Sequence, residues 1–464
     1  MSCVCRATGR KNGINGSLSG DANLQKQEGV FLFVNFLRKN FWCGGGCDII
    51  KVMNLKNSTL WVLMSLVLCL MFFGVVWAQK DLIWRAGNIS VENTNTITFL
   101  VDTEARVFAR DESEFFMNVD MLAKPRTIFG KMLFTGNIFW GRGINKRARA
   151  SELGVRYPFQ NLDDFEREKY TDWIADLECP ITDRGHDDYA ESELLKFNCD
   201  PDYLVEISKY FSAFSLGTNH TDNQGVDGFI ETRENLKAHN IKFFGHFNIN
   251  RTDELCSILK MKAKIGDSES VKDTSVPMAF CGINDTYTPS GEAVIEEVRK
   301  YAEVFPTIVL VHSGEEYQAH SDSRREMLFR AFIDAGAEFV IGDHPHYVQN
   351  AEVYKGKPIF YSLGNFLFDQ GWNEEVKRSA MIEASFEIDE SNWAWSAISE
   401  DCERGLEFCL RAMERNGLVK LTPRWKFDVL GSVVDGGVVR KVDEKNMQGI
   451  LERLNWNEVR ARLE

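Results

Sequence analysis

The histidines of this sequence lie where a metal ion could be bound. Asp343-His344-Pro345-His346 follows the apolar run EFVIG, His312 follows TIVLV, and His220 ends the segment FSLGTNH. Four of the eight histidines therefore follow three short apolar segments of strand character. Neutral imidazole is a good ligand for zinc, manganese or iron. A lone His-x-His pair can also occupy a polar loop, so the whole set, and not one pair, predicts a metal site.

The two histidines of the HPH sequence are expected to point the same way. His344 and His346 are two residues apart, and side chains at this spacing point to the same side only when the backbone is extended. Pro345 disfavours a helical conformation at His344, the residue before it. This predicts an extended HPH segment at the end of a strand.

The segments that must position these histidines alternate in character from Thr127 onward. Short apolar runs end in glycine or polar residues: IFGKMLFTG, DWIADLE, FSAFSLGTNH, IKFFGHF, VPMAFCGIN, TIVLVHSG and EFVIGDHPH. Between them, PDYLVEISKYF, GFIETRENLKAHN and SRREMLFRAFIDAG have apolar residues at helical spacing. Alternating strands and helices indicate a layered α/β fold, in which ligands gather at the carboxyl ends of strands.

In combination and in order, these motifs resemble the CapA family of capsule and poly-γ-glutamate synthesis proteins. The matching segments are FTGNIFWGRG, ADLECPITD, TNHTDNQGVDGF, HSGEEY, GDHPHYVQNAEVY and KGKPIFYSLGNFLFDQ. They cover roughly residues 127–372, about half of the chain. The family is similar to metallophosphoesterases, so the resemblance implies a four-layer αββα sandwich that holds one or two divalent ions, namely Mn, Zn or Fe.

The resemblance also implies roles for individual residues. The metal ligands would be Asn137, Glu178, Asn219, His312, His344 and His346. The catalytic residue would be His220, which would donate a proton to a leaving group. Substrate would be bound by Arg142, Glu316 and Asn365.

Several of these positions depart from the family pattern. The amides Asn137 and Asn223 stand where the family has Asp, and Ser313 stands where it has Trp. A neutral ligand at Asn137 weakens metal binding and leaves a more positive site. Each residue also has a structural alternative: Asn137 could bond to the backbone, Glu178 could pair with an Arg, and Asn219 could stabilise a turn.

An apolar stretch, WVLMSLVLCLMFFGVVW, precedes the α/β region and follows Lys51 and Lys56. We expect residues 58–78 to be a signal peptide or a signal-anchor helix, which places the later residues outside the cytoplasm, either membrane-anchored or secreted. Residues 1–57 are a doubtful extension, with Met53 a candidate start. Residues 79–126 are expected to be a membrane-proximal β segment or linker, and residues 373–464 a C-terminal strand and helical extension.

The composition limits the partners. A net charge of −14 argues against nucleic acid, because non-specific affinity for its backbone comes mainly from Lys and Arg. The expected partners are an anionic cell-envelope polymer or its precursor, the membrane, and a membrane synthase or export subunit. The 11 cysteines form no CxxC pair, and we interpret those after residue 78 as buried free thiols, although export would permit disulfides.

Two functions fit these observations. The first is a metal-dependent hydrolase or transferase that acts on a phosphoester or a γ-glutamyl amide. The alternative is a non-catalytic accessory subunit for polymer synthesis or export.

Overall fold

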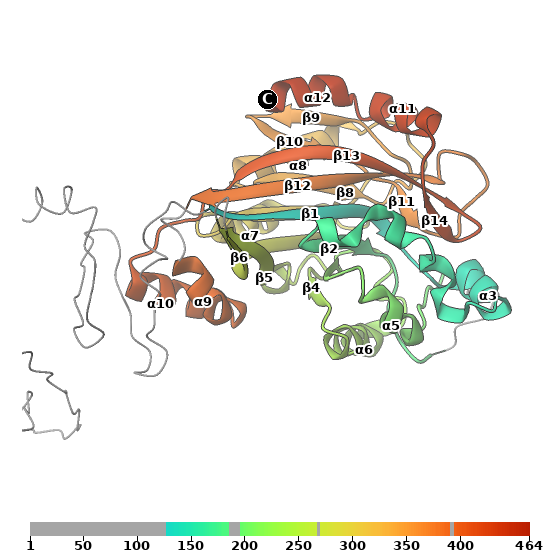
Figure 1. The fold of residues 1–464 in the computed structure, drawn as a ribbon, viewed down its shortest axis with the longest axis horizontal. Coiled ribbons are helices and arrows are strands. Elements are labelled where there is room, and N and C mark those ends of the chain that lie inside the picture. Colours follow the sequence, from blue (N-terminus) through green and yellow to red (C-terminus); the bar gives the residue numbers. More distant parts are fainter. Residues whose placement is uncertain (1–126, 185–194, 267–269, 390–393) are drawn as a thin grey trace, which may run out of the picture. The chain divides into compact units, whose positions relative to one another are not determined.

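The computed structural model describes residues 127–184, 195–266, 270–389 and 394–464 (Figure 1). The strands are β1 (Thr127–Ile138), β2 (Asp172–Leu177), β3 (Ala213–Ser215), β4 (Lys242–Phe244), β5 (Cys256–Gly266), β6 (Val271–Asn284), β7 (Thr307–His312), β8 (Phe339–Asp343), β9 (Ala351–Tyr354), β10 (Lys357–Phe360), β11 (Asn365–Leu367), β12 (Arg378–Asp389), β13 (Arg424–Asp435) and β14 (Val438–Lys441). The helices are α3 (Arg142–Ala150), α5 (Leu204–Ile207), α6 (Gly225–Ala238), α7 (Glu292–Ala302), α8 (Ser323–Asp334), α9 (Ala394–Glu403), α10 (Leu406–Asn416), α11 (Glu444–Arg453) and α12 (Trp456–Leu463). The expected extension 1–57, signal segment 58–78 and linker 79–126 lie outside the described residues.

Hydrogen bonds join the described strands into one branched, 14-stranded sheet. The main path runs β14-β13-β12-β1-β5-β6-β7-β8-β10-β9, and β2, β3 and β4 form a branch that starts at β1. The long strands β1, β12 and β13 lie side by side in Figure 1. The chain is therefore a mixed α/β protein, as the alternating segments predict.

The sheet forks within β1. One edge of β1 pairs with β12 from Thr127 to Phe134. The other edge pairs first with β5, through Phe129↔Lys264, and then with β2, from Met132 onward. A fork therefore opens between Phe129 and Met132, where β5 and β2 separate.

Parallel strands bring several polar residues to one edge of the sheet. Strands β1 to β4 pair in parallel, and so do β6, β7 and β8. Asn137 is in register with Asp176 at the ends of β1 and β2, and His312 is in register with Asp343 at the ends of β7 and β8. The carboxyl ends of the two groups therefore carry the residues of the candidate site.

Apolar side chains are buried on both faces of β1. Met132 joins one core cluster and the neighbouring Leu133 joins the other, as the two-residue period of a strand requires. In the first cluster Phe339 of β8 lies edge-on to Phe134 of β1, with ring centroids 5.4 Å apart, and to Phe427 of β13, at 5.2 Å. Strand β8 thus packs face to face against β1 and β13, although it is not hydrogen-bonded to either strand.

Helices flank this sheet on different sides (Figure 1). Helices α11 and α12 contact β9, β10, β12 and β13, whereas α6 contacts β4. The start of α8 is stabilised by Asp322, whose carboxylate accepts hydrogen bonds from two backbone N–H groups of the first turn. Gly336, with a φ of +107°, follows its end. In the described part of the chain, no helix combines the length and apolar character needed to cross a membrane.

Six cysteines form disulfides, so the interpretation of these residues as free thiols is wrong. The pairs are Cys179–Cys199, Cys256–Cys281 and Cys402–Cys409. Cys256 and Cys281 face each other across the β5–β6 ladder, and this register is set by strand pairing. The fold therefore decides the pairing, which cysteine spacing alone does not reveal.

Candidate metal centre

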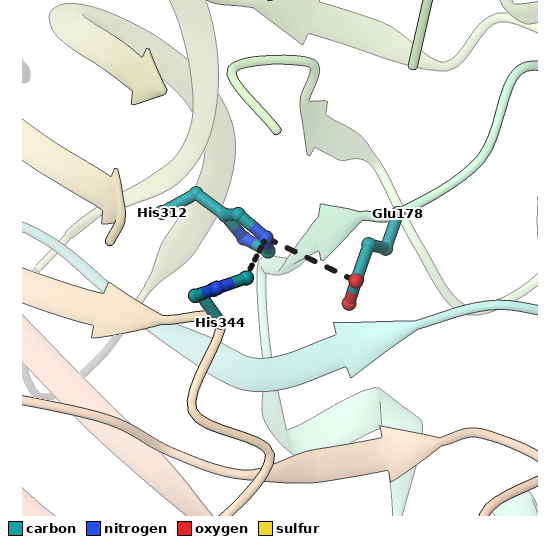
Figure 2. A group of neighbouring side chains, drawn as sticks. All are labelled: Glu178, His312 and His344. Carbon is teal, nitrogen blue, oxygen red and sulfur yellow. Dashed lines mark hydrogen bonds and ion pairs between the residues drawn. The ribbon is translucent and has the colours of Figure 1, made fainter. Parts of the chain in front are cut away.

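Three buried side chains from distant parts of the chain meet at the carboxyl edge of the sheet (Figure 2). Glu178 follows β2, His312 ends β7 and His344 follows β8. One ligand atom from each lies within 4.8 Å of the others. All three are buried, with His312 fully so and Glu178 only 1% exposed. These side chains could hold a metal ion.

Further predicted residues surround the same carboxylate. The Nε2 atoms of His220, His312 and His346 lie 3.9, 3.9 and 4.0 Å from Oε1 of Glu178. Oδ1 of Asn219 lies 2.9 Å from Nε2 of His312. The structure therefore brings these predicted residues together around one carboxylate.

The rings of His220, His312 and His346 are each held in orientation by a hydrogen bond at Nδ1, the nitrogen that points away from Glu178. The Nδ1 atoms pair as follows: His220 with Asn223 (2.8 Å), His312 with Asp176 (2.6 Å) and His346 with Asn365 (2.8 Å). In the Nδ1–H tautomer, each ring donates a hydrogen bond to this oxygen. A neutral ring then presents the lone pair of Nε2, which is the form that binds a metal.

Asn137 reaches this cluster through a close approach of two backbones. Its N–H donates to the carbonyl of Gly364 at 2.9 Å, and it is in register with Asn365. A Cβ at the preceding Gly136 would lie only 1.9 Å from the Gly364 oxygen, so a side chain there would separate the strands. Nδ2 of Asn137 lies 3.3 Å from Nδ1 of His346, and its buried Oδ1 has no hydrogen-bond partner among the described residues.

At the buried carboxyl groups of the centre, burial outweighs the effect of the nearby arginines Arg142 and Arg325. Burial raises the pKa of Asp176 to about 8, and burial raises the pKa values of Glu178 and Asp343 well above their usual range. Oε2 of Glu178 is buried and has no hydrogen-bond partner among the described residues. Such a group is costly unless a positive charge is placed beside it.

Burial also disfavours the protonated, positively charged form of the histidine rings. Burial lowers the pKa values of His220 and His346 to about 4, and it lowers those of His312 and His344 well below the usual value. Neutral imidazole nitrogens, a carboxylate and amide oxygens therefore face one another. This donor set fits a divalent ion such as Mn, Zn or Fe, which would supply the missing positive charge.

The HPH segment reaches this geometry by a different backbone from the predicted one. His344 has a φ of +96° and His346 a φ of +59°, so the expectation of an extended segment is wrong. Positive φ values of this kind are uncommon for residues other than glycine, and they gather at functional sites. Two turns, and not one strand face, direct both rings inward.

The residues predicted to bind substrate have different surroundings. Arg142 forms a two-point ion pair with Asp369, at 2.5 and 3.1 Å, so an anion would have to compete with that carboxylate. Glu316 is exposed, and its charge raises the pKa of Glu178, which places it near the pocket. Asn365 is fully buried and holds the ring of His346.

Four residues that contact the centre were given no role by the sequence. Asp176 and Asn223 orient His312 and His220, Phe197 stacks on His220 at 3.8 Å between ring centroids, and Tyr317 stacks on His346 at 5.7 Å. An acid within the fully buried strand DWIADL is a signal that could have singled out Asp176. The aromatic residues carry no comparable signal.

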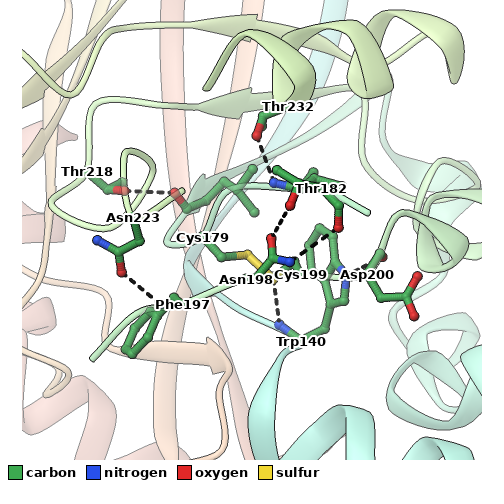
Figure 3. Close-up of a disulfide and its surroundings, with 12 residues drawn as sticks. Trp140, Cys179, Thr182, Phe197, Asn198, Cys199, Asp200, Thr218, Asn223 and Thr232 are labelled. Atoms are coloured by element: carbon green, nitrogen blue, oxygen red, sulfur yellow. Dashed lines mark hydrogen bonds between the residues drawn. A yellow bond between two sulfur atoms is a disulfide. The ribbon is translucent and has the colours of Figure 1, made fainter. Parts of the chain in front are cut away.

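The two residues that flank Glu178 in the sequence are both held in place, and Figure 3 shows Cys179 in its disulfide with Cys199 and also shows Thr218. The carbonyl of Leu177 accepts a hydrogen bond from the Thr218 hydroxyl at 3.0 Å. The next residue, Cys179, is joined to Cys199, whose sulfur accepts from the backbone N–H of Trp140 at 3.4 Å. The disulfide therefore limits how far the carboxylate can move.

A mixed α/β fold with a buried Glu-His centre at its strand ends defines the class of this protein. Residues 131–370, just over half of the chain, match the family described as "Bacterial capsule synthesis protein PGA_cap". The chain belongs to this family, which confirms the resemblance to CapA proteins.

Individual relatives agree with this assignment. The chain is 29% identical over 257 residues to the "PGA biosynthesis protein CapA" of Bacillus subtilis (strain 168), covering 54% of this chain and 66% of that protein. It is 25% identical over 283 residues to the "Capsule biosynthesis protein CapA" of Bacillus anthracis, covering 54% and 62%. A "Probable polyglutamine synthesis accessory protein" of Mycobacterium tuberculosis is 24% identical over 212 residues, covering 42% and 55%. The chain thus spans less than two thirds of the length of each.

Among solved structures, that of TT1561 from Thermus thermophilus aligns with a TM-score of 0.27 and 10% identity, covering 54% of this chain and 93% of that one.

Proposed function

We propose that this protein is a metal-dependent hydrolase or transferase that acts on an anionic cell-envelope polymer, or its precursor, outside the cytoplasm. The observation that carries the proposal is the convergence of three Nε2 atoms on Oε1 of Glu178, within 4.0 Å, with each ring held at Nδ1. A cluster that served only to stabilise the fold would place N–H donors against this carboxylate. In the Nδ1–H tautomers that we propose, lone pairs of Nε2 face it instead.

The ligand set that we propose is Asn137, Glu178, Asn219, His312, His344 and His346. A divalent cation held there supplies Lewis-acid chemistry: it polarises a phosphoester or amide oxygen and activates water. Asp176 and Asn365 keep the rings of His312 and His346 in the orientation that this requires.

His220 is the proposed proton-transfer residue. Its Nε2 faces the centre, while Nδ1 is bonded to Asn223 and the ring is stacked on Phe197. To act as a general acid the ring must carry a second proton, and the neutral amide of Asn223 stabilises an imidazolium less than a carboxylate would. Proton donation by His220 is therefore expected to depend on the charge of the bound substrate.

The substrate class follows from the relatives. Two of them are named for capsule or PGA biosynthesis, so we propose poly-γ-glutamate or a related polyanion, with a phosphoester precursor as the other target. A membrane synthase or export subunit is the proposed partner. We also propose that the branched sheet forms the two middle layers of an αββα sandwich, which the contact of Phe339 with Phe134 and Phe427 supports.

Export is proposed on two grounds. The apolar stretch before residue 78 resembles a signal or anchor segment. Disulfides are typical of oxidising compartments and rare in the cytosol, and the described residues contain three.

The second candidate function is a non-catalytic accessory subunit. The amides at Asn137 and Asn223, where the family has acids, favour it because both reduce the negative charge that metal catalysis would use. The mycobacterial relative is itself named an accessory protein.

Metal content and turnover of the purified full-length protein separate these functions. We expect close to one or two equivalents of a divalent ion, and hydrolysis of a generic phosphodiester or of poly-γ-glutamate. The His312→Ala variant should lose both properties, whereas His239→Ala, a ring whose Nδ1 pairs with the carbonyl of Asn235 in α6, should keep them. Metal without turnover would identify an accessory protein, and the absence of bound metal under metal-replete conditions would refute the metal centre.

A further inference from the structure

A second cavity lies at the fork of the sheet, at the opposite end of β1 from the metal centre. Its volume is about 770 Å³, and β1, β5, β6, β12 and the segment before β2 contribute its walls. We call it the fork pocket. Lys131, in its wall, precedes Asn137 by six residues, which corresponds to about 20 Å along an extended strand.

The fork pocket is rich in cations, although the protein carries a net charge of −14. Its cationic lining residues are Lys131, Arg167, Lys169, Lys262 and Lys264, and its acidic ones are Glu168, Asp273 and Glu387. One of these acids, Glu387, already lies within ion-pair distance of Arg424 and Lys426. Two of the cations are paired with acids just outside the lining, Lys131 with Glu383 and Lys169 with Glu166. The cations of the lining that form no ion pair with a carboxylate among the described residues are Arg167, Lys262 and Lys264.

Two of these lysines are exposed, and each lies near one acid. Lys264 is in register with Asp273 on β6, and the backbone N–H of Lys262 donates to Asp172. Lys262 and Lys264 are exposed on the outer face of β5, and neither forms an ion pair with a carboxylate in the described ranges. Residues two apart on a strand point to the same side, so their ammonium groups project together. The two lysines form a short cationic row along one wall.

The other cations are held in place by the fold. Arg167 donates to the backbone carbonyls of Tyr210 and Tyr170, at 2.7 and 2.6 Å, and neither bond neutralises its charge. Lys131 lies 5.9 Å from the ring centroid of Tyr170 and 3.3 Å from Glu383. Arg167 is therefore a fixed guanidinium in the same lining as Lys262 and Lys264.

We propose that the fork pocket is a second binding site, which holds a carboxylate-rich chain away from the metal centre. Separate ammonium groups suit carboxylates that are spaced along a flexible chain. Phe129, which also lines the pocket and is partly exposed, offers apolar surface to the methylene groups of such a chain. The choice of a carboxylate chain rests on the proposed function, whereas the site itself rests on the cavity and its charges.

The inference is tested by the binding of labelled poly-γ-glutamate oligomers to the full-length protein after chelation of metal. We expect binding that weakens as ionic strength rises, because exposed charges are screened. Lys262→Gln/Lys264→Gln should weaken it by about tenfold, since two exposed charge contacts are lost together. The Lys300→Gln/Lys445→Gln protein, which loses the same charge from α7 and α11, should bind within about twofold of wild type.

Three outcomes would overturn the inference. If Glu178→Gln abolishes polymer binding and the lysine pair does not, the polymer is held only at the metal centre. If the control pair weakens binding as much as the pocket pair, net charge and not the pocket is responsible. If phosphatidylglycerol vesicles bind through Lys262 and Lys264 and the polymer cannot displace them, the pocket faces a membrane surface.

Failure of this inference can be told apart from failure of the proposed function. Metal content and turnover of a small phosphodiester should be unchanged in Lys262→Gln/Lys264→Gln, because both side chains are exposed and lie at the far end of β1. Turnover without any metal-independent polymer binding would reject the second site and leave the metal-dependent activity in place.

Discussion

At the scale of single residues, the proton on Nδ1 of each anchored histidine determines what the centre can do. In the tautomers that we propose, His220, His312 and His346 each donate from Nδ1 to an oxygen, and each then turns an unprotonated nitrogen toward Glu178. If those protons were on Nε2, the same residues would form an ordinary network of hydrogen bonds to a carboxylate. The acceptors Asp176, Asn223 and Asn365 are thus as informative as the rings themselves.

Glu178→Gln should have opposite effects on metal binding and on the stability of the metal-free protein. Metal affinity should fall by at least about 100-fold, because the only charged ligand among those proposed is lost. The melting temperature without metal should stay the same or rise, since burial disfavours ionisation of this carboxyl group. Calorimetric titration and thermal melts measure the two effects, with the exposed Glu234→Gln on α6 as the control. A large loss of stability in metal-free Glu178→Gln would indicate a structural role.

Asn137→Asp should tighten the binding of divalent metal. The buried Oδ1 of Asn137 has no hydrogen-bond partner among the described residues, and a carboxylate there would add negative charge to the proposed ligand set. The same change should lower the melting temperature of the metal-free protein, because it adds an unpaired buried acid. Titration of manganese into Asn137→Asp and into a surface control, Asn240→Asp, measures the effect. Equal or weaker affinity would place Asn137 outside the ligand set.

The sequence revealed the ligands better than the groups that orient them. Histidines and Glu178 stand out because they interrupt apolar segments within recognisable motifs. Asp176 is equally close to the centre, but a single acid within a strand does not reveal which ring it contacts. The positive φ values of His344 and His346 were also missed, since the spacing of two histidines does not specify the backbone between them.

At the scale of elements, apolar runs were sufficient to predict the central strands. TIVLVH and FVIGD became β7 and β8, and both are buried along their full length. The pairing of β1 with β12 could not be predicted, because it depends on contacts between segments that are distant in sequence. The same reason explains the disulfides: no local pattern tells which sulfurs the folded sheet brings together.

Removal of the disulfide beside Glu178 should weaken metal binding as well as stability. Cys179→Ser/Cys199→Ser should lose about 3 kcal/mol of folding free energy, as expected for a loop of this length. The matched control is Cys256→Ser/Cys281→Ser, whose partners are 25 residues apart compared with 20 and which does not adjoin Glu178. Denaturant unfolding and metal titration should show similar losses of stability in both, with lower metal affinity only in the first. Equal metal affinity in the two variants would mean that the disulfide does not position the carboxylate.

At the scale of the whole molecule, the described residues from Thr127 onward should be accessible from outside the cell membrane. The basic residues before WVLMSLVLCLMFFGVVW predict this orientation, and disulfide formation requires an oxidising compartment. Protease added to intact spheroplasts should digest the protein, while a cytoplasmic marker protein survives. Protection until the membrane is lysed would contradict the proposed export.

The pairing of β1 with β12 has a consequence for the timing of folding. Thr127 and Asp389 are partners at one end of this ladder, and more than half of the chain separates them. As the polypeptide is made, β1 has no strand on that edge until the segment beyond residue 378 has emerged. Contacts between such distant segments slow folding, because a long loop must close before they form. Late folding of this kind would keep the chain unfolded for longer during synthesis. An unfolded chain can pass through a secretion channel, which suits the proposed export.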